Sequence, residues 1–481
     1  MAVARLLRQL GHAALGASVF AVLTGVAPAA AITANAECCG DLEARVAELE
    51  AAAVHKGNSK VEIEFGGAVS RALLLWDDQQ NTQGYIVTND GEGSKFEFSG
   101  KAEHLDGGNW SAGLHIEVNV QGAGSGDVSQ FDDNIPTALE IDESQIWIAN
   151  KKLGQLSWGF VGGTGENIED LTESDLSDTS TAGYSGVEDI GGGFFLRQSN
   201  VRGTPGLLPV VWGDLIDHLP GIDGAIVRYD TPVYRGFEAN ATWGQADKWQ
   251  LALNWASEPE EDAEENPELA DVEDKADPKA YPAQTGLLKI FHISGVIGLF
   301  EINDHFVDEP DTRTVAGSLS VLHKPTGLSL TGAAARRQYI SSVKFNDGEV
   351  DRPSDPWFYY LKAGWIRDLN KLGKTAFYAE YGSFNQFLGR DADEETVAAM
   401  GGIDEDAVCA TARDACLVSG SNARIWGLGV VQFVQKAEMQ LYTAYRHYEP
   451  DVSLANLRGS RVGSVPLDAF DTIITGALID F

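Results

Sequence analysis

Apolar and polar side chains alternate with a period of two from Lys60 to the end of the chain. In the segment 111–120, for example, every even position is apolar and the odd positions hold Ser, Gly, His, Glu and Asn. Successive side chains of a strand point to opposite faces, so each such segment predicts a strand with one apolar and one polar face. Strands of a soluble β-sandwich alternate in the same way, so the connections must decide the architecture.

Short and long connections alternate along the chain. Short turns are expected at 106–109, 150–155, 231–236, 324–327, 370–374 and 435–438. Longer polar connections are expected at 77–93, 121–137, 341–356, 389–423 and 452–467. A transmembrane barrel has this pattern, with short periplasmic turns and long outer loops. The sequence therefore predicts an all-β fold, a transmembrane antiparallel β-barrel over residues 60–481.

About sixteen strands are expected, an even number within the range of bacterial barrels. They lie near 61–76, 94–104, 110–121, 139–149, 155–161, 222–231, 236–245, 248–257, 286–303, 313–323, 327–340, 357–368, 374–388, 424–434, 438–449 and 468–481. An even number places both ends of the barrel on the periplasmic side.

The last ten residues, Thr472 to Phe481, are predicted to close the barrel. An open sheet edge cannot exist in hydrocarbon, so the final strand must pair with the first, near residues 61–69. By the alternation of the strand, Phe481 points to lipid at the periplasmic rim and Asp480 points to the lumen.

Residues 1–36 have the features of a signal peptide. Arg5 and Arg8 form a basic start, an apolar run covers 13–26, and small residues follow. An uncleaved anchor is the weaker alternative, because the run is rich in Ala and ends in small residues. No later stretch approaches the ~18 to 20 apolar residues of a spanning helix. The sequence therefore predicts export of a chain without a helical membrane span.

Residues 37–59 predict a short helical segment. Its apolar residues at a/d spacing are Leu42, Val46 and Leu49. Barely more than one heptad cannot hold a coiled coil alone, so a structural spacer is favoured over a trimerising tether. Both alternatives stay open.

Charge and cysteine content narrow the function. The net charge is −36 with a pI near 4.5, which argues against nucleic acid as a partner. Cys409 and Cys416 are close enough to form a disulfide around a small loop, whereas adjacent Cys38 and Cys39 stay unassigned. No nucleophile elbow, H-E-x-x-H motif, phosphate-binding glycine loop or zinc-spaced cysteine set is present. We therefore expect no enzymatic activity, no cofactor and no metal.

Two segments interrupt the strand pattern. Residues 161–221 are too long for an ordinary connection and carry several acids before a glycine-rich run. Residues 258–274 are dominated by acids, with no basic residue before Lys275. Strand parity puts this acidic insertion at a periplasmic turn, where a long insertion is unexpected. Either the parity slips there or the protein carries an unusual acidic flap.

Several short motifs, in this order, resemble those of the general porins of the Gram-negative outer membrane, alphaproteobacterial type. They are residues 38–43 after the signal, 192–197 (Gly-Gly-Phe-Phe-Leu-Arg), 427–432 (Gly-Leu-Gly-Val-Val-Gln), 445–448 (Tyr-Arg-His-Tyr) and the terminal Phe481. The resemblance covers the mature chain, except that the insertion at 258–274 departs from it. It implies a homotrimer of sixteen-stranded barrels, with the third outer loop, within 161–221, folded into the lumen as a constriction. It also implies that the barrel-assembly machinery recognises Phe481.

A barrel of this size leaves an aqueous channel whose lumen charges set its selectivity. The candidate constriction acids are Glu166, Glu169, Asp170, Glu173 and Asp175. The basic residues that strand parity turns inward are Lys101, Arg228, Arg337, Lys362 and Arg446. The alternative is that the loop acids form only a solvated face. The negative net charge predicts weak cation preference, although outer-loop acids could instead bind divalent cations that bridge lipopolysaccharide.

The leading hypothesis is an outer-membrane channel for passive diffusion of small hydrophilic solutes and ions. A substrate-specific channel for sugars or anions would need an aromatic slide or a basic constriction, and neither is evident in the sequence. An exported β-rich adhesin would need a hydrophilic outer face.

Overall fold

The computed structural model describes residues 61–105, 109–132, 136–161, 175–177, 179, 190–199, 206–216, 219, 224–244, 247–259, 280–303, 311–341, 343–344, 350–351, 354–388, 416–456 and 461–481. The chain divides into a unit of residues 1–63 and a unit of residues 64–481, and the second is the subject below. The predicted signal peptide and helical segment lie outside the described residues. Within the described ranges, no helix is long and apolar enough to cross a membrane.

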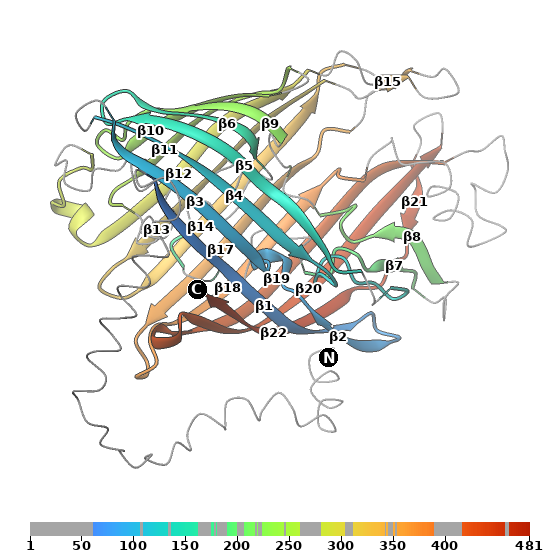
Figure 1. The fold of residues 1–481 in the computed structure, drawn as a ribbon. Helices are drawn as coiled ribbons and strands as arrows, with labels where there is room; N and C mark the ends of the chain where they lie inside the picture. The colour runs from blue at the N-terminus through green and yellow to red at the C-terminus, as the bar shows by residue number, and fades with distance from the viewer. Residues whose placement is uncertain are drawn as a thin grey trace, which may run out of the picture. The chain divides into compact units, whose positions relative to one another are not determined.

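Sixteen antiparallel strands form one closed sheet, in which each strand pairs with its neighbour along the chain and the last pairs with the first (Figure 1). They are β1 (Glu62–Asp77), β3 (Lys95–Leu105), β4 (Trp110–Gln121), β5 (Ala138–Asn150), β6 (Gly154–Val161), β9 (Gly224–Asp230), β10 (Phe237–Gly244), β11 (Trp249–Ala256), β12 (Phe291–Ile302), β13 (Thr312–His323), β14 (Leu328–Tyr339), β17 (Trp357–Arg367), β18 (Thr375–Asn385), β19 (Cys416–Val434), β20 (Met439–Asn456) and β22 (Phe470–Asp480). The predicted sixteen-stranded barrel is confirmed.

The boundaries differ from the prediction mainly where strands extend beyond the apolar alternation. β19 begins at Cys416 rather than near 424, and β20 continues to Asn456 rather than 449, because the two strands pair outward as a long hairpin. Residues 286–289 form a 3-10 helix, so β12 begins at Phe291. Short strands were missed: β2 (Thr82–Val87), β7 (Phe195–Arg197), β8 (Leu207–Val211), β15 (Val343–Lys344), β16 (Val350–Asp351) and β21 (Arg461–Val465).

The last strand closes the barrel as predicted, but in a different register. β22 pairs with β1 from Ala68 opposite Asp480 to Asp77 opposite Asp471. Two backbone hydrogen bonds of 2.9 and 3.0 Å between Gly67 and Phe481 continue the ladder. The predicted pairing with residues 61–69 is therefore wrong by several residues. Strands of a barrel are staggered, so the start of β1 extends past the end of β22.

The acidic insertion at 258–274 does not change the strand parity. β11 and β12 pair directly, up to Ala256 opposite Ser294, so their connection lies at the same end as the short turns. The described ends of this connection are tied to the two neighbouring turns. Gly236 N–H donates to the Ala280 carbonyl, and Lys324 forms an ion pair with Glu258. Of the two alternatives left open by the sequence, slipped parity is therefore excluded; residues 260–274 themselves lie outside the described part.

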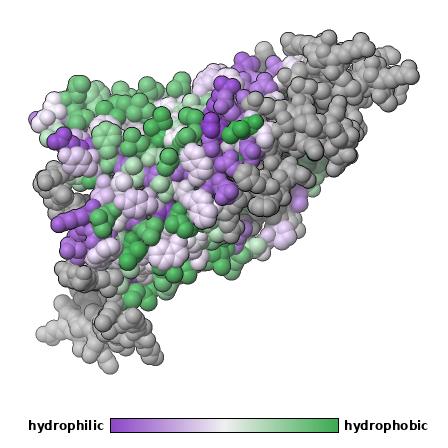
Figure 2. Space-filling model, turned by 90° about the horizontal axis from the view of Figure 1, so that it is seen from above, coloured by the Kyte–Doolittle hydropathy of each residue, from purple (hydrophilic) through white to green (hydrophobic). Residues whose placement is uncertain are grey.

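The two faces of the sheet differ as the alternation requires. On β17 the side chains of Trp357, Tyr359 and Leu361 are exposed, whereas Phe358, Tyr360 and Lys362 between them are buried. The exposed set belongs to the outer face, where hydrophobic residues cover much of the visible wall (Figure 2). An apolar outer face of this kind is what a barrel presents to lipid.

Candidate functional site

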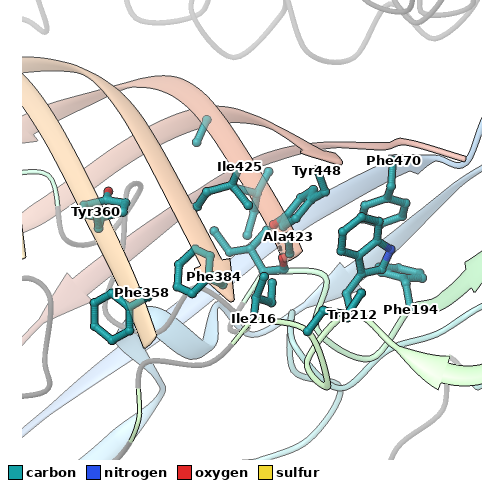
Figure 3. Close-up of a cluster of buried hydrophobic side chains, with 14 of the residues drawn as sticks. Phe194, Trp212, Ile216, Phe358, Tyr360, Phe384, Ala423, Ile425, Tyr448 and Phe470 are labelled. Carbon is teal, nitrogen blue, oxygen red and sulfur yellow. Dashed lines mark hydrogen bonds between the residues drawn. The ribbon is translucent and has the colours of Figure 1, made fainter. Parts of the chain in front are cut away.

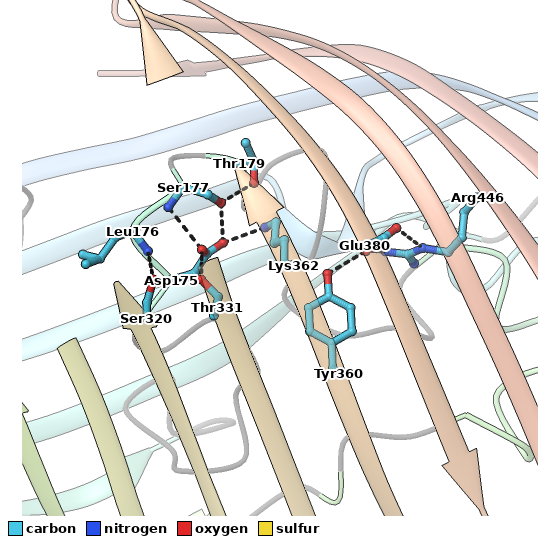
Figure 4. A network of polar contacts seen from close by, with 10 residues as sticks. All are labelled: Asp175, Leu176, Ser177, Thr179, Ser320, Thr331, Tyr360, Lys362, Glu380 and Arg446. Atoms are coloured by element: carbon cyan, nitrogen blue, oxygen red, sulfur yellow. Dashed lines mark hydrogen bonds and ion pairs between the residues drawn. The ribbon is translucent and has the colours of Figure 1, made fainter. Parts of the chain in front are cut away.

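The connection between β6 and β9 contacts the inner face of the barrel. Leu176 N–H donates to Ser320 Oγ of β13 at 3.2 Å. Thr331 Oγ1 of β14 and Lys362 Nζ of β17 donate to the two Asp175 carboxylate oxygens, at 2.6 and 2.7 Å. These three strand residues are buried inner-face side chains. The segment predicted to be the third loop therefore enters the lumen, as Figure 4 shows for Asp175.

Asp175 and Lys362 form a buried ion pair, with side chains 4% and 0% exposed. Ser177 Oγ also donates to the carboxylate, at 2.6 Å. Burial alone would raise the pKa of Asp175, but the Lys362 ammonium and the hydroxyl donors of Ser177 and Thr331 hold that pKa below its usual value. Asp175 is thus ionised, and it anchors the loop to the wall.

A second buried pair lies on the same side of the lumen (Figure 4). Arg446 of β20 donates to both carboxylate oxygens of Glu380 on β18, at 2.9 and 3.2 Å. Tyr360 of β17 donates its hydroxyl to Glu380 as well, at 2.6 Å. The Arg446 and Glu380 side chains are 3% and 0% exposed. Both charges are therefore neutralised by a partner and withdrawn from water.

Further along the same connection, the hairpin of β7 and β8 packs against the barrel wall through an aromatic cluster (Figure 3). Phe194 lies 5.0 Å from Trp76 between ring centroids, and Trp212 lies 5.2 Å from Tyr448 and 5.6 Å from Phe470. Each of these rings is at most 2% exposed. Large buried aromatic groups contribute much of the apolar stabilisation of a core. The glycine-phenylalanine motif of residues 192–197 therefore fixes the hairpin to the inner wall.

The opposite inner face, on β3 to β5, carries accessible charges. We call Glu97, Glu117, Glu140, Asp142 and Glu143 the acidic patch. Lys95 Nζ lies 2.6 Å from Glu97 and 3.1 Å from Glu117, but the three side chains remain 34%, 26% and 13% exposed. Unlike the buried pairs, these charges are in contact with water.

A β-bulge enlarges the acidic patch. The register of β4 and β5 shifts between Glu117 and Val118, so Asp142 and Glu143, neighbours in sequence, both lie at the inner face. Asp142 bonds the Asn119 side chain, and Glu143 accepts from Gln145 Nε2 at 3.2 Å. Strict alternation would have turned one of the two acids to lipid.

Above the acidic patch, a cavity of about 670 Å³ separates the wall from the hairpin. We call it the outer pocket. Its lining includes Ser94 and Asn119 of the wall, and the carboxylates of Asp90, Asp127 and Asp214 from three different connections. Asn119 faces Lys95 in the β3–β4 register and bonds Asp142, so the outer pocket adjoins the acidic patch.

The sequence-predicted site residues fall into three groups. Asp175, Lys362 and Arg446 belong to the buried pairs, and Lys362 and Arg446 are 1% and 2% exposed as whole residues. Arg228 bonds Asp230 at 2.8 Å, Arg337 donates to Thr314 at 3.1 Å, and Lys101 lies half-buried on β3. The remaining residues are not described at the side-chain level: Glu166, Glu169, Asp170, Glu173, Cys409 and Cys416.

Strand parity identifies inward-facing acids as well as inward-facing bases. The same parity places Glu97 and Glu117 with Lys101 on the inner face, so these two could have been found. Asp142 could not, because its orientation depends on the bulge. Glu380 could have been found as the parity-matched neighbour of Lys362, its direct partner in the β17–β18 register.

Comparison with known proteins gives a likeness of fold. No protein-family model matches the chain, and no curated protein matches it. An anion-selective porin from Comamonas acidovorans is 14% identical, with 88% of this chain and 100% of that chain covered and a TM-score of 0.48. A loop-deletion mutant of OmpT, an outer membrane protein of Vibrio cholerae, is 10% identical, with 88% and 100% covered and a TM-score of 0.47. Salmonella typhi OmpF, in a complex with daunomycin, is 9% identical, with 88% and 99% covered and a TM-score of 0.45.

Proposed function

We propose that the protein is an outer-membrane channel for passive diffusion of small hydrophilic solutes and ions, with a weak preference for cations. The observation that carries this proposal is the acidic patch, an exposed cluster of carboxylates on the inner face of a closed barrel with an apolar outside. Charge on the lining of a narrow aqueous path determines which ions enter it.

The balance of accessible charge favours cations. Among the inner-face side chains of β3 to β5 that the structure describes, the acidic patch supplies five carboxylates, and Lys95 and Lys101 supply two ammonium groups, so their formal sum is −5 + 2 = −3. On the other side, Lys362 and Arg446 are neutralised by Asp175 and Glu380. Two of the five cations expected to oppose the acids, Lys362 and Arg446, are thus neutralised by buried partners, which leaves the acidic patch as the larger accessible charge.

The constriction is assigned to the connection between β6 and β9. Asp175 fixes one part of it to the wall at β14 and β17, and the hairpin fixes another part at β1, β20 and β22. Glu166, Glu169, Asp170 and Glu173 precede the Asp175 anchor in sequence. We place them along the narrowest part of the path, where they add to the negative field.

The position of Arg71 is an argument for assembly into a homotrimer. It lies on the outer face of β1 opposite Ala477, on the same face as the exposed Val69 and Leu73, and its side chain is exposed. Its guanidinium donates to the Ser70 carbonyl and to the hydroxyls of Thr88 and Ser94, and within the described residues it meets no carboxylate. An arginine that faces lipid costs up to about 2–4 kcal/mol at the bilayer midplane and less toward the interfaces. Contact with a second copy at this face would remove that cost.

The remaining assignments follow from the channel function. The signal peptide directs export to the outer membrane of a Gram-negative cell, where lipid and lipopolysaccharide surround the barrel. The barrel-assembly machinery recognises Phe481, which lies exposed at the end of the closing strand.

The test is the reversal potential of the purified protein in planar bilayers under a KCl gradient. The double variant Glu117→Gln with Glu143→Gln should lower the cation-to-anion permeability ratio by about two- to threefold, because it removes two charges from the lumen. Glu449→Gln, on the outer face of β20, is the matched control and should leave the ratio unchanged. No channel activity, or an unchanged ratio in the double variant, would contradict the proposal.

A further inference from the structure

We propose that Asp90 and Asp127 form an electrostatically coupled carboxyl pair in the outer pocket that takes up one proton near neutral pH. Acidification through neutral pH then removes one negative charge there and lowers the cation preference of the channel. This inference rests on the proposed function for its electrical consequence, but not for the protonation itself.

The two carboxylates are close together. A Cβ built on Gly124 would lie 2.3 Å from Asp90 Oδ2 and 2.7 Å from Asp127 Oδ2, so these two oxygens are at most 2.3 + 2.7 = 5.0 Å apart. Two carboxylates at such a separation resist simultaneous ionisation, and the pair takes up a proton more readily than either group alone.

The backbone holds the pair in place. The Asp127 segment is bonded on one side to the connection between β2 and β3, where Gly126 N–H donates to Asp90 Oδ2 at 2.7 Å and Ser125 N–H donates to the Thr88 carbonyl at 2.9 Å. On the other side, Gly191 and Gly193 at the start of the hairpin donate to the carbonyls of Ser125 and Gly126. These bonds fix the backbone on both sides of Asp127, and the Gly126 N–H holds the Asp90 carboxylate close to it. Uptake of a proton by the pair relieves the repulsion between the two carboxylates.

The charged groups around the pair do not neutralise it. From β1, Arg71 reaches Thr88 and Ser94, but it forms no ion pair with Asp90 or Asp127. From β3, Lys95 is engaged by Glu97 and Glu117. From the hairpin, Asp214 adds a further negative charge to the same pocket.

Burial also favours the protonated form of both carboxyl groups. It raises the pKa of Asp90 to about 7, opposed by the Gly126 hydrogen bond and assisted by the charge of Asp127. Burial also raises the pKa of Asp127. Both groups lie in connections between strands rather than in the spanning strands.

The electrical test measures reversal potentials of the full-length protein in bilayers from pH 5 to pH 9. The wild-type permeability ratio of cations to anions should rise by about twofold between pH 6 and pH 8, as expected for one charge about 10 Å from the ion path in water. Asp90→Asn should abolish this step and hold the ratio at its acid value. Asp214→Asn, the matched control from the same pocket, should lower the ratio at every pH while keeping the step.

A second measurement reports on the pair without requiring a channel. Infrared difference spectra of the purified protein between pH 6 and pH 8 should show loss of a protonated-carboxyl C=O band in wild type and in Asp214→Asn, but not in Asp90→Asn. Loss of that band in Asp90→Asn, or a wild-type ratio that is flat across neutral pH, would overturn the proposal. If the protein forms no channel but the band titrates, the proposed function fails and the carboxyl pair stands.

Discussion

Charged side chains are buried and paired on one side of the lumen and exposed to water on the other. On the side of β14 to β22, Lys362 and Arg446 are each held by a buried carboxylate and lie beside packed aromatic rings. On the side of β3 to β5, the acidic patch shares only a few cations and stays exposed to water. A buried ion pair fixes structure, whereas an exposed charge of one sign creates a field. One inner face therefore positions the loop, and we propose that the other acts on ions.

This division explains why strand parity alone is a poor guide to function. Lys101, Arg228, Arg337, Lys362 and Arg446 all lie at inward positions. Lys362 and Arg446, however, are buried beside the carboxylates of Asp175 and Glu380. Inward position thus indicates access to the lumen only where no other part of the chain covers the side chain.

The largest expected effect on stability comes from removing a buried cation on the side of β14 to β22. Lys362→Met leaves the Asp175 carboxylate buried without its cation, which costs about 3–5 kcal/mol of unfolding free energy. Urea unfolding of the detergent-solubilised protein, followed by Trp fluorescence, measures the change.

A matched control and a rescue variant make that prediction specific. Arg313→Met removes a cation whose side chain is 49% exposed, and its loss should cost no more than about 1 kcal/mol. Combining Asp175→Asn with Lys362→Met removes both charges and should recover part of the stability. Equal losses for Lys362→Met and Arg313→Met would remove the distinction between the two kinds of pair.

A smaller effect is expected at Asp90, a half-buried acid of the outer pocket. Its pKa is raised from an ordinary 3.8 to about 7, so the unfolded chain releases this proton at lower pH than the folded protein does. The contribution of Asp90 to unfolding free energy therefore falls between about pH 4 and pH 7 and is level above that. Between pH 5 and pH 8 the loss is about 3 kcal/mol.

Asp90→Asn should remove this pH dependence. The unfolding free energy of the variant relative to the wild type should therefore increase as the pH rises. The measurement is the difference in urea midpoint between the two proteins at pH 5 and pH 8. Asp451→Asn, an exposed acid of β20, serves as the control and should leave that difference near zero. A constant difference between wild type and Asp90→Asn would show that Asp90 titrates as an ordinary acid.

The barrel could be predicted from the sequence because its determinants are local. The alternation of side chains and the short turns fixed the number of strands and the closure by Thr472–Phe481. The register of that closure depends on the stagger of the whole barrel, which no single strand contains. For the same reason the parity at the acidic insertion is determined by the pairing of β11 with β12, which the sequence of the insertion does not contain.

The candidate site was predictable only in part, because its chemistry depends on contacts distant in sequence. Asp175 and Lys362 were both singled out, but their pairing joins residues 187 positions apart. Asp142 reaches the lumen through a bulge, and Asp90 meets Asp127 through two connections that sequence reasoning treated only as polar loops.

The smallest effect on stability is expected at the acidic patch, and it is the sharpest test of the division between the two sides. Glu143→Gln keeps the size of the side chain and its contact with Gln145, and the group is partly exposed. Its unfolding free energy should change by no more than about 0.5 kcal/mol, as for most accessible substitutions. The same variant should measurably lower the cation-to-anion ratio, because the lost charge faces the ion path. Substitution of a buried charge on the side of β14 to β22 should give the reverse result, with a large loss of stability and little change of selectivity. If Glu143→Gln destabilised the barrel as much as Lys362→Met, the acidic patch would be part of the structural framework, and the field that it creates would be incidental.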